Sequence, residues 1–232
     1  MMKSSRVILG CLVIALLATA ASAGWVPLTG EPVSLSSLQG GSLVFGDKEL
    51  SEIDIFGIGT GGAIAPDACS VFVQGGWDDT TGDYGLRFLL SWNAFSGQTI
   101  NANLNFKISV LSDYDDYFIK DVVLDITGSS ATGTGGVNLG ERVQNAEGDI
   151  IASLSCSKQY NDGGAYLTDY ADFDPLKAIW IHSKDVSITG GTDGSAHLSE
   201  FYQYYSQIPE PATVVLLGTA GIWIFTRKRR SV

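Results

Sequence analysis

The sequence predicts an all-β protein: a single two-sheet β-sandwich of jelly-roll type, flanked by an N-terminal signal peptide and a C-terminal transmembrane helix. Between Gly24 and Ile208 helical periodicity is almost absent, whereas short runs rich in Val, Ile, Phe and Tyr recur between clusters of Gly, Asn, Asp and Ser. This body, which we place at residues 24–206, is long enough to bury a substantial core in one domain. Its ten expected strands fit two packed sheets better than a small barrel.

Residues 1–23 have the pattern of a secretory signal peptide. Lys3 and Arg6 precede an apolar stretch at 7–20, which is short for a membrane span. Ala21 and Ala23 supply the small side chains that signal peptidase accepts at its cleavage site. We therefore expect cleavage after Ala23, with a retained N-terminal anchor as the alternative.

The strands of the body follow from runs of β-branched and aromatic residues between turn residues. At 101–111 apolar residues alternate with Asn, Lys and Ser, which predicts a strand with one solvated face. The stretch 196–205 has aromatic residues at both odd and even positions, as in a central strand or one that pairs with a partner. The stretch 127–140 is rich enough in Gly, Ser and Thr to predict an exposed loop. The expected strands are 43–45, 49–56, 69–74, 85–94, 99–111, 117–126, 150–158, 178–182, 186–189 and 196–205.

Two acidic stretches are predicted to be loops and are candidate calcium sites. Asp113, Asp115 and Asp116 lie together in a short turn, and residues 169–174 form a second cluster with three aspartates. Ca²⁺ prefers several oxygen ligands on a pliable loop. Neither stretch has the spacing of an EF-hand, and plain solvated turns are the alternative. Calcium is the only cofactor that the sequence suggests.

Two of the three cysteines, Cys69 and Cys156, remain once the signal peptide is removed. Counting by twos places each thiol on an apolar strand face. In an oxidising compartment a disulfide between two strands fits this pattern, and two separate buried thiols are the alternative.

The charge of the body excludes nucleic-acid binding. The chain has 14 Lys and Arg and 25 Asp and Glu, of which the terminal segments contain six and one. The body is left with 8 basic and 24 acidic residues, a net charge of about −16. Such a surface repels nucleic acid and anionic membranes and lacks the basic stripe that phosphate binding needs.

No catalytic residue can be assigned, so we expect a protein that is not an enzyme. The only histidines are His182 and His197, and no G-x-S-x-G elbow is present. Gly57, Gly59 and Gly62 have the G-x-G-x-x-G spacing, but a β-like run follows where a dinucleotide site needs a helix, which indicates a glycine-rich turn. A glycoside hydrolase needs only two carboxylates, and 24 acidic residues single out none.

Aromatic side chains supply the alternative hypothesis of a carbohydrate-binding or carbohydrate-active protein. Trp77 stands beside two glycines and two aspartates, so we expect it to be exposed and able to stack on a sugar. Trp180 stands between two isoleucines and is expected in the core. The full set of candidates for a sugar-stacking platform is Trp77, Trp92, Trp180, Tyr202, Tyr204 and Tyr205.

The chain ends with three ordered signals: a Pro-Glu-Pro, an apolar run and a basic cluster. At about 1.5 Å per residue the 15 residues of the run cover roughly 22 Å as a helix, which is short of a hydrocarbon core of about 30 Å. The basic side chains can snorkel toward lipid headgroups and stay in the cytoplasm, which leaves the body outside. The three signals are Pro209, Glu210 and Pro211, then 212–226, then Arg227, Lys228, Arg229 and Arg230.

This tail, residues 207–232, resembles the PEP-CTERM sorting signal of exported bacterial proteins. The resemblance implies recognition by an exosortase, a membrane-embedded cysteine protease, and cleavage near the Pro-Glu-Pro. It also implies a transient inner-membrane anchor and delivery to the cell surface or the extracellular matrix, where polysaccharide is a candidate partner. An ordinary tail anchor is the alternative. The leading functional hypothesis is therefore a structural or binding protein of the cell surface or of a biofilm matrix.

Overall fold

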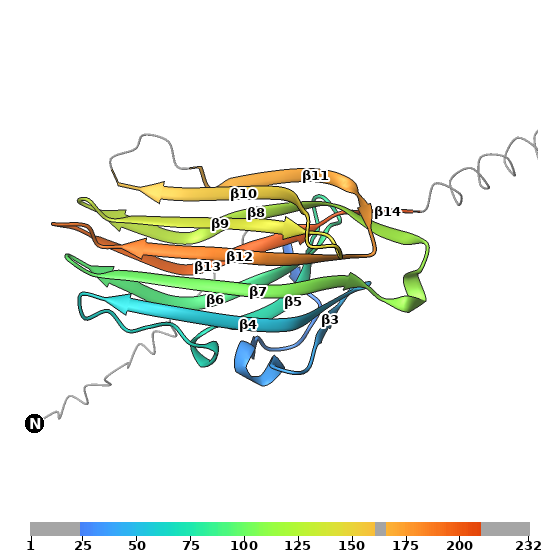
Figure 1. The fold of residues 1–232 in the computed structure, drawn as a ribbon, viewed down its shortest axis with the longest axis horizontal. Helices are drawn as coiled ribbons and strands as arrows, with labels where there is room; N and C mark the ends of the chain where they lie inside the picture. Colours follow the sequence, from blue (N-terminus) through green and yellow to red (C-terminus); the bar gives the residue numbers. More distant parts are fainter. Residues whose placement is uncertain (1–23, 161–165, 210–232) are drawn as a thin grey trace, which may run out of the picture.

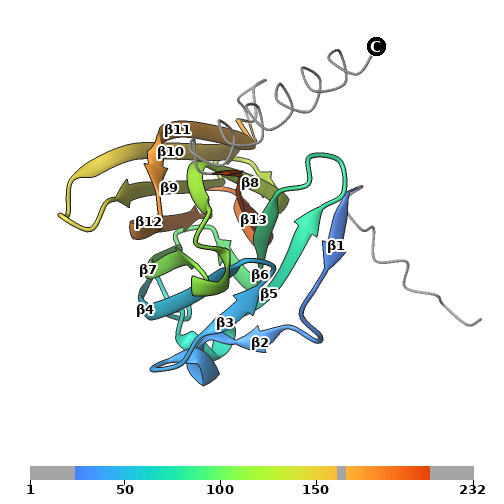
Figure 2. The ribbon, with the colours of Figure 1, turned by 90° about the vertical axis from the view of Figure 1, so that its right-hand side faces the viewer.

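The computed structural model describes residues 24–160 and 166–209, which form two packed antiparallel sheets (Figure 1, Figure 2). The prediction of an all-β sandwich is therefore confirmed. The strands run close to the long axis of the molecule (Figure 1). Three short 3-10 helices lie in the connections: η1 (Leu35–Leu38), η2 (Ala68–Ser70) and η3 (Ser112–Tyr114).

One sheet, which we call sheet A, has eight strands. They are β1 (Trp25–Pro27), β2 (Val33–Ser34), β5 (Phe72–Asp78), β6 (Tyr84–Phe95), β8 (Tyr117–Thr132), β11 (Thr168–Leu176), β13 (Ser195–Tyr205) and β14 (Gln207–Pro209). The main path is β1-β5-β6-β13-β8-β11, with β2 paired to β5 and β14 paired to β8. β13 lies between β6 and β8, so the closing aromatic stretch is a central strand.

The other sheet, sheet B, has six strands in the order β10-β9-β12-β7-β4-β3. They are β3 (Leu43–Phe45), β4 (Lys48–Thr60), β7 (Thr99–Val110), β9 (Gly136–Gln144), β10 (Ile150–Gln159) and β12 (Ala178–Thr189). The predicted strands 178–182 and 186–189 are thus one continuous strand.

The pairing of the last eight long strands is nested. β6 pairs with β13, β7 with β12, β8 with β11, and β9 with β10. Each pair lies in one sheet, and successive pairs alternate between sheet A and sheet B. This order is the one that a jelly-roll winding produces, and β4 and β5 extend the two sheets on one side.

The core lies between the sheets and is built from alternate residues of each strand. In β7 the side chains of Leu104, Phe106 and Ile108 are buried while the intervening polar residues face outward, which confirms the predicted solvated face. Phe88 of β6 stacks on Phe201 of β13 with ring centroids 4.7 Å apart, and Phe106 approaches Phe88 at 5.7 Å. Burial of one such side chain stabilises the fold by about 2 to 3 kcal/mol.

The loop predicted at 127–140 is wrong, because it consists mostly of strand. β8 continues to Thr132 and β9 begins at Gly136, with a tight turn between them in which Gly133 has φ of 56°. Thr132 pairs with Ser195, and their hydroxyl oxygens lie 2.9 Å apart. Threonine suits a pleated surface, so this segment pairs with β13 despite its polarity.

The second acidic loop, at 169–174, is also a strand. β11 pairs with β8 at the edge of sheet A, with Tyr170 opposite Val123 and Asp172 opposite Asp121. Its inward residues Ala171 and Phe173 pack against the core. Charged outward residues are common on edge strands, where they discourage pairing with another chain.

The targeting segments lie largely outside the described residues. These residues contain no helix that is long and apolar enough to cross a membrane. The predicted signal peptide with Ala21 and Ala23, the predicted transmembrane segment 212–226 and the basic cluster 227–230 are not among them. Of the Pro-Glu-Pro, only Pro209 is described, where it ends β14 opposite Tyr117.

Candidate functional site

A cavity of about 360 Å³ lies at one end of the sandwich. It is bounded by the connection from β4 to β5, by the second half of β6 and by the start of β7. Binding cavities for small ligands usually have about 300 to 1,000 Å³. The lining residues are Gly62, Ala63, Ile64, Ala65, Pro66, Asp67, Ser70, Ser91, Trp92, Asn93, Phe95, Gln98 and Ile100.

Glycines of β4 let the connection fold back to form one wall of this cavity. A Cβ on Gly57 would lie 2.3 Å from the carbonyl oxygen of Pro66, and one on Gly59 would lie 2.2 Å from that of Ala63. Both distances are shorter than any real contact, so only glycine permits this approach. The predicted turn is therefore confirmed only at Gly62, because Gly57 and Gly59 lie in β4 itself.

The cavity combines apolar walls with hydrogen-bonding groups. Trp92 is 5% exposed, and its buried indole Nε1 has no hydrogen-bond partner among the described residues. Phe95 is 61% exposed at the cavity. Gln98 Oε1 accepts a hydrogen bond of 3.0 Å from Phe95 N, and Asn93 adds a second side-chain amide. The site thus offers an aromatic face, two amides and an unused indole donor.

The described lining of the cavity does not hold the two carboxylates that a glycoside hydrolase uses. Asp67 is the only acidic side chain in its lining, so the described residues provide no pair of carboxylates there. Asp67 Oδ1 accepts a hydrogen bond of 2.9 Å from Ser70 N and caps η2. The arrangement therefore fits binding of a neutral polar molecule with an apolar face.

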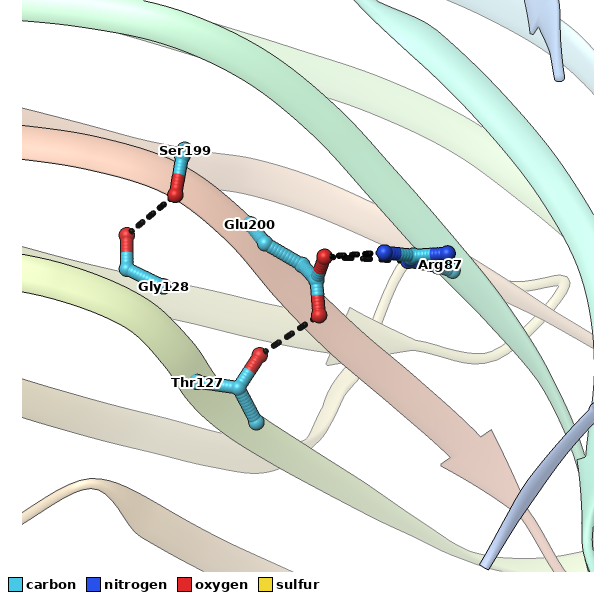
Figure 3. Close-up of polar contacts among 5 residues, drawn as sticks. All are labelled: Arg87, Thr127, Gly128, Ser199 and Glu200. Atoms are coloured by element: carbon cyan, nitrogen blue, oxygen red, sulfur yellow. Dashed lines mark hydrogen bonds and ion pairs between the residues drawn. The ribbon is translucent and has the colours of Figure 1, made fainter. Parts of the chain in front are cut away.

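The outer face of sheet A carries a polar group that crosses three strands (Figure 3). Arg87 Nε of β6 donates a hydrogen bond of 3.0 Å to Glu200 Oε2 of β13, and Thr127 Oγ1 of β8 donates one of 3.0 Å to Glu200 Oε1. Beside it, Ser199 Oγ donates to the carbonyl oxygen of Gly128 at 3.0 Å. Both carboxylate oxygens of Glu200 are thus engaged, so this group is mainly a cross-strand support.

Three aromatic rings lie next to this group on the same face. Tyr202 and Tyr204 are parallel with centroids 5.8 Å apart, and Trp25 of β1 meets them edge-on at 5.1 and 6.0 Å. The space exists because β5 and β6 carry glycine there: a Cβ on Gly76 would lie 2.4 Å from Trp25, and one on Gly85 would lie 2.6 Å from Tyr204. All three rings are less than a tenth exposed, so they do not form an open stacking surface.

A smaller, acidic cavity of about 260 Å³ adjoins Tyr204. Thr168 Oγ1 donates a hydrogen bond of 2.6 Å to Asp125 Oδ1 at its edge. Burial raises the pKa of Asp83, because desolvation disfavours the charged carboxylate. The lining residues are Asp78, Thr81, Asp83, Val123, Asp125, Thr168 and Tyr204. This cavity repels anions and lies below the usual volume of a ligand site.

The outer face of sheet B holds a shallow groove of about 240 Å³. Phe56 is 63% exposed there, and Asn103 Nδ2 donates a hydrogen bond of 2.7 Å to Asp185 Oδ1. On the same face Lys107 Nζ lies 4.8 Å from the Trp180 ring centroid. Trp180 therefore points outward, and the prediction that it packs in the core is wrong, because the alternation that buries Ile179 and Ile181 turns it away.

The two thiols for which the sequence predicts a disulfide, those of Cys69 and Cys156, are free in this structure. Cys69 lies exposed in the 3-10 helix η2 and not on a strand, since β5 begins only at Phe72. Cys156 is buried in β10, as predicted, and its Sγ donates to the carbonyl oxygen of Leu124 at 3.4 Å. Counting by twos misplaced the Cys69 side chain because it assumed that Cys69 lies in a strand.

The predicted calcium sites do not assemble. No group of three or more His, Cys, Asp or Glu in residues 24–160 and 166–209 is arranged to hold a metal ion. Asp113, Asp115 and Asp116 are exposed in and after η3, and it is the backbone carbonyl of Asp115 that receives a contact, from Lys177 Nζ. The turn thus resembles the alternative that the sequence left open, a solvated acidic turn.

The predicted aromatic platform is dispersed over the molecule. Trp77 is half-buried in β5 between Val26 of β1 and Tyr84 of β6, so it is not the exposed side chain that the sequence predicts. Tyr205 lies in the core, whereas Trp92 lines the end cavity. Phe95, Asn93 and Gln98 of the cavity were not predicted, since single aromatic and amide residues at the end of a strand give no sequence signal beyond a turn.

No protein-family model matches the chain, and no curated protein matches it. Among solved structures, the enzymatically active domain of tailspike protein 4 of bacteriophage CBA120 is similar with 16% identity and a TM-score of 0.28, over 66% of this chain and 19% of that one. A chitosan-binding module derived from a chitosanase/glucanase of Paenibacillus sp. IK-5 has 16% identity and a TM-score of 0.17, over 50% of this chain and 76% of that one. The chain spans only about a fifth of the length of the tailspike domain. Likenesses at these TM-scores carry no argument about function.

Proposed function

We propose that this protein is an exported component of the cell surface or extracellular matrix that binds a neutral saccharide in the end cavity. The unpartnered indole donor of Trp92, beside the exposed ring of Phe95, is the observation that carries the proposal. A buried donor without an acceptor is costly, and a ligand oxygen removes that cost when it binds. An aromatic face next to amides suits a sugar ring, which has apolar C–H faces and polar edges.

The charge of the body narrows the ligand class. A net charge of about −16 opposes the approach of anionic polysaccharides. The end cavity has a single carboxylate in its lining, and that carboxylate already caps η2. A neutral, hydroxyl-rich polymer is therefore the favoured ligand, and binding without turnover is the favoured activity.

The test is a binding measurement on the mature protein with a panel of neutral and acidic polysaccharides. Trp92→Phe keeps the ring but removes the donor, and it should weaken binding about threefold to tenfold. Phe95→Ala should weaken it further, because the aromatic face is lost. Phe56→Ala, on the outer face of sheet B, is the matched control and should leave affinity unchanged.

Two results would contradict the saccharide proposal. Absence of binding to every neutral polysaccharide would leave a structural matrix protein as the better description. Loss of affinity in Phe56→Ala, with Trp92→Phe unaffected, would move the site to sheet B. Release of reducing sugar from any substrate would contradict the proposed absence of enzymatic activity.

Export and processing rest on the signal peptide pattern and on the PEP-CTERM-like tail. Replacing Pro209, Glu210 and Pro211 by alanine should leave export intact but trap an uncleaved, membrane-bound form in a host with the matching exosortase. The prolines disfavour helix and keep the backbone extended where a protease reaches it. If the altered protein is cleaved and released like its parent, the tail is only an anchor.

A further inference from the structure

A buried polar cluster lies between the two sheets. Its members are Lys184 of β12, Glu141 of β9 and Gln203 of β13, which are 0%, 3% and 0% exposed. Lys184 Nζ forms a short ion pair with Glu141 Oε2, and Gln203 Nε2 donates a hydrogen bond of 2.8 Å to Glu141 Oε1. One carboxylate therefore contacts an amine from sheet B and a carboxamide from sheet A.

Lys184 points into the core because β12 carries a bulge beside it. Ile179 and Ile181 are buried, so strict alternation would turn Ser183 inward and Lys184 outward. The register with β7 shifts between Ile181 and Lys184, and Ser183 has φ of 50°, a strained value for a residue with a Cβ. Asn105 Oδ1 accepts a hydrogen bond of 2.9 Å from Ser183 N and holds the bulge in place. Bulges and strained residues often re-aim a side chain at a functional site.

The other buried lysine of the described residues, Lys48, has conventional partners. Its Nζ donates hydrogen bonds to Asp47 Oδ1 at 2.9 Å and to Gln207 Oε1 at 3.1 Å. Burial lowers the pKa of Lys48 as it does that of Lys184, and the neighbouring Asp47 carboxylate opposes the shift at Lys48. Lys48 therefore serves as an internal reference for a buried lysine with a structural role.

Among the described residues Lys184 has a single carboxylate partner, Glu141, and no second acceptor like Gln207 of the Lys48 group. Within the described ranges, Lys184 Nζ, Glu141 Oε2 and Gln203 Oε1 have no contact with the geometry of a hydrogen bond, although Nζ and Oε2 are close. The Phe201 ring centroid lies 5.0 Å from Nζ. Burial in these surroundings lowers the pKa of Lys184, which favours the neutral amine that can act as a nucleophile.

We propose that Lys184 and Gln203 form an intramolecular isopeptide bond, with Glu141 as the acid-base group that contacts both reacting nitrogens. Nζ attacks the side-chain carbonyl carbon Cδ of Gln203, the Nζ–Cδ bond forms, and the Cδ–Nε2 bond breaks. The neutral Nζ gives up one proton, which Glu141 carries to Nε2, so that Nε2 leaves as ammonia and Nζ becomes the N–H of the new amide. The exchange of one amide for another needs no oxidant, reductant or co-reactant.

The geometry supplies what an amide, a poor electrophile, needs for this reaction. Glu141 Oε2 faces the attacking nitrogen and Oε1 faces the leaving nitrogen, so one group removes and delivers the protons. Reactants that a fold holds together react as if at very high concentration. The product joins β12 of sheet B to β13 of sheet A and closes a covalent ring of residues 184–203 across the sandwich. This inference does not depend on the proposed ligand.

The test is a peptide map of the full-length chain, expressed with its own signal peptide and recovered folded. A protease that cleaves before aspartate cuts at Asp185 and Asp193, which separates the peptide Asp174–Lys184 from the one that contains Gln203. We expect the two to remain joined, with a mass lower by one ammonia than their sum. Two separate peptides of unchanged mass would overturn the proposal. A loss of water with Lys184 joined to the Glu141 peptide would also overturn it.

Variants assign the roles. Gln203→Leu removes the electrophile and should give only separate peptides, whereas Glu141→Gln removes the proton relay and should abolish or greatly slow the joining. Lys48→Arg is the matched control and should leave the joined species intact. An undiminished yield of the joined peptides in Glu141→Gln would refute the role of Glu141. If a variant fails to fold, the peptide map of the parent chain still shows whether the bond between Lys184 and Gln203 forms.

Discussion

Replacement of Gly59 by alanine should destabilise the protein by displacing the connection that walls the end cavity. The added Cβ would lie 2.2 Å from the carbonyl oxygen of Ala63 and 3.0 Å from the backbone nitrogen of Ala65. Ordinary contact begins at 3.4 Å, so backbone atoms, which cannot rotate away, would have to move by about 1.2 Å. Overpacking of this kind costs about 1 to 3 kcal/mol.

Thermal unfolding followed by circular dichroism measures this effect. For a body of this size each kcal/mol lowers the midpoint by about 2 to 4 °C, so we expect a loss of about 2 to 12 °C. Ala63 and Ala65 line the cavity, so saccharide affinity should fall as well. Gly140→Ala is the matched control, because its Cβ would lie 3.7 Å from the Leu154 carbonyl oxygen and its φ is not in the left-handed region. A Gly59→Ala protein that melts like the Gly140→Ala protein would refute the reasoning.

Three further predictions concern thiols and charges. Burial raises the pKa of Cys156 from 9.0 to about 12, so between these pH values the folded state keeps a proton that the unfolded state loses. The free energy of unfolding should therefore fall as the pH rises across that range. In alkaline urea titrations, Cys156→Ala should reduce the slope of the unfolding free energy against pH by about 1.4 kcal/mol per pH unit. An unchanged slope would contradict this. A thiol reagent should modify Cys69 and spare Cys156 in the folded protein, since only Cys69 is exposed; equal labelling, or no labelling without reduction, would argue against it. Arg87→Ala should lower the free energy of unfolding by about 1 to 2 kcal/mol, because it removes the hydrogen bond to Glu200. Lys120→Ala should change it little, because the Lys120 and Asp121 side chains are 3.7 Å apart, beyond the length of a hydrogen bond. Equal effects of the two substitutions in urea denaturation would count against a special role for Arg87.

Hydrophobic alternation was sufficient to predict most of the strands. The boundaries of β3 and the start of β7 at Thr99 agree with the sequence, as does the solvated face of β7. The glycine-rich turn after β4 was also predicted, because glycines followed by a β-like run are incompatible with a helix. Alternation also missed the short strands β1, β2 and β14. The two longer strands that it missed, β9 and β11, are rich in Gly, Thr or Asp, and pairing with a neighbour decides their conformation.

The faces of several strands were predicted less well, because bulges reverse them. Leu198, Tyr202 and Tyr204 have the same parity in sequence, yet Leu198 lies in the core while the tyrosines lie on the outer face. The register shift between Leu198 and Glu200 accounts for the change. A shift of one residue moves every later side chain to the other face, and a periodicity argument does not detect it.

The sequence by itself determined that the body is acidic and folds as a β-sandwich. Only the tertiary structure decided which side chains meet: Trp92 with the connection after β4, and Lys184 with Glu141 and Gln203. These partners come from strands that are far apart in the chain and are brought together by the nested pairing of β6 to β13. Local sequence encodes alternation and turns. The bulge at Ser183 and the close packing of Gly59 against the Ala63 backbone depend instead on the position of a neighbouring strand or loop. Contacts of that kind become defined only when the sheets pack.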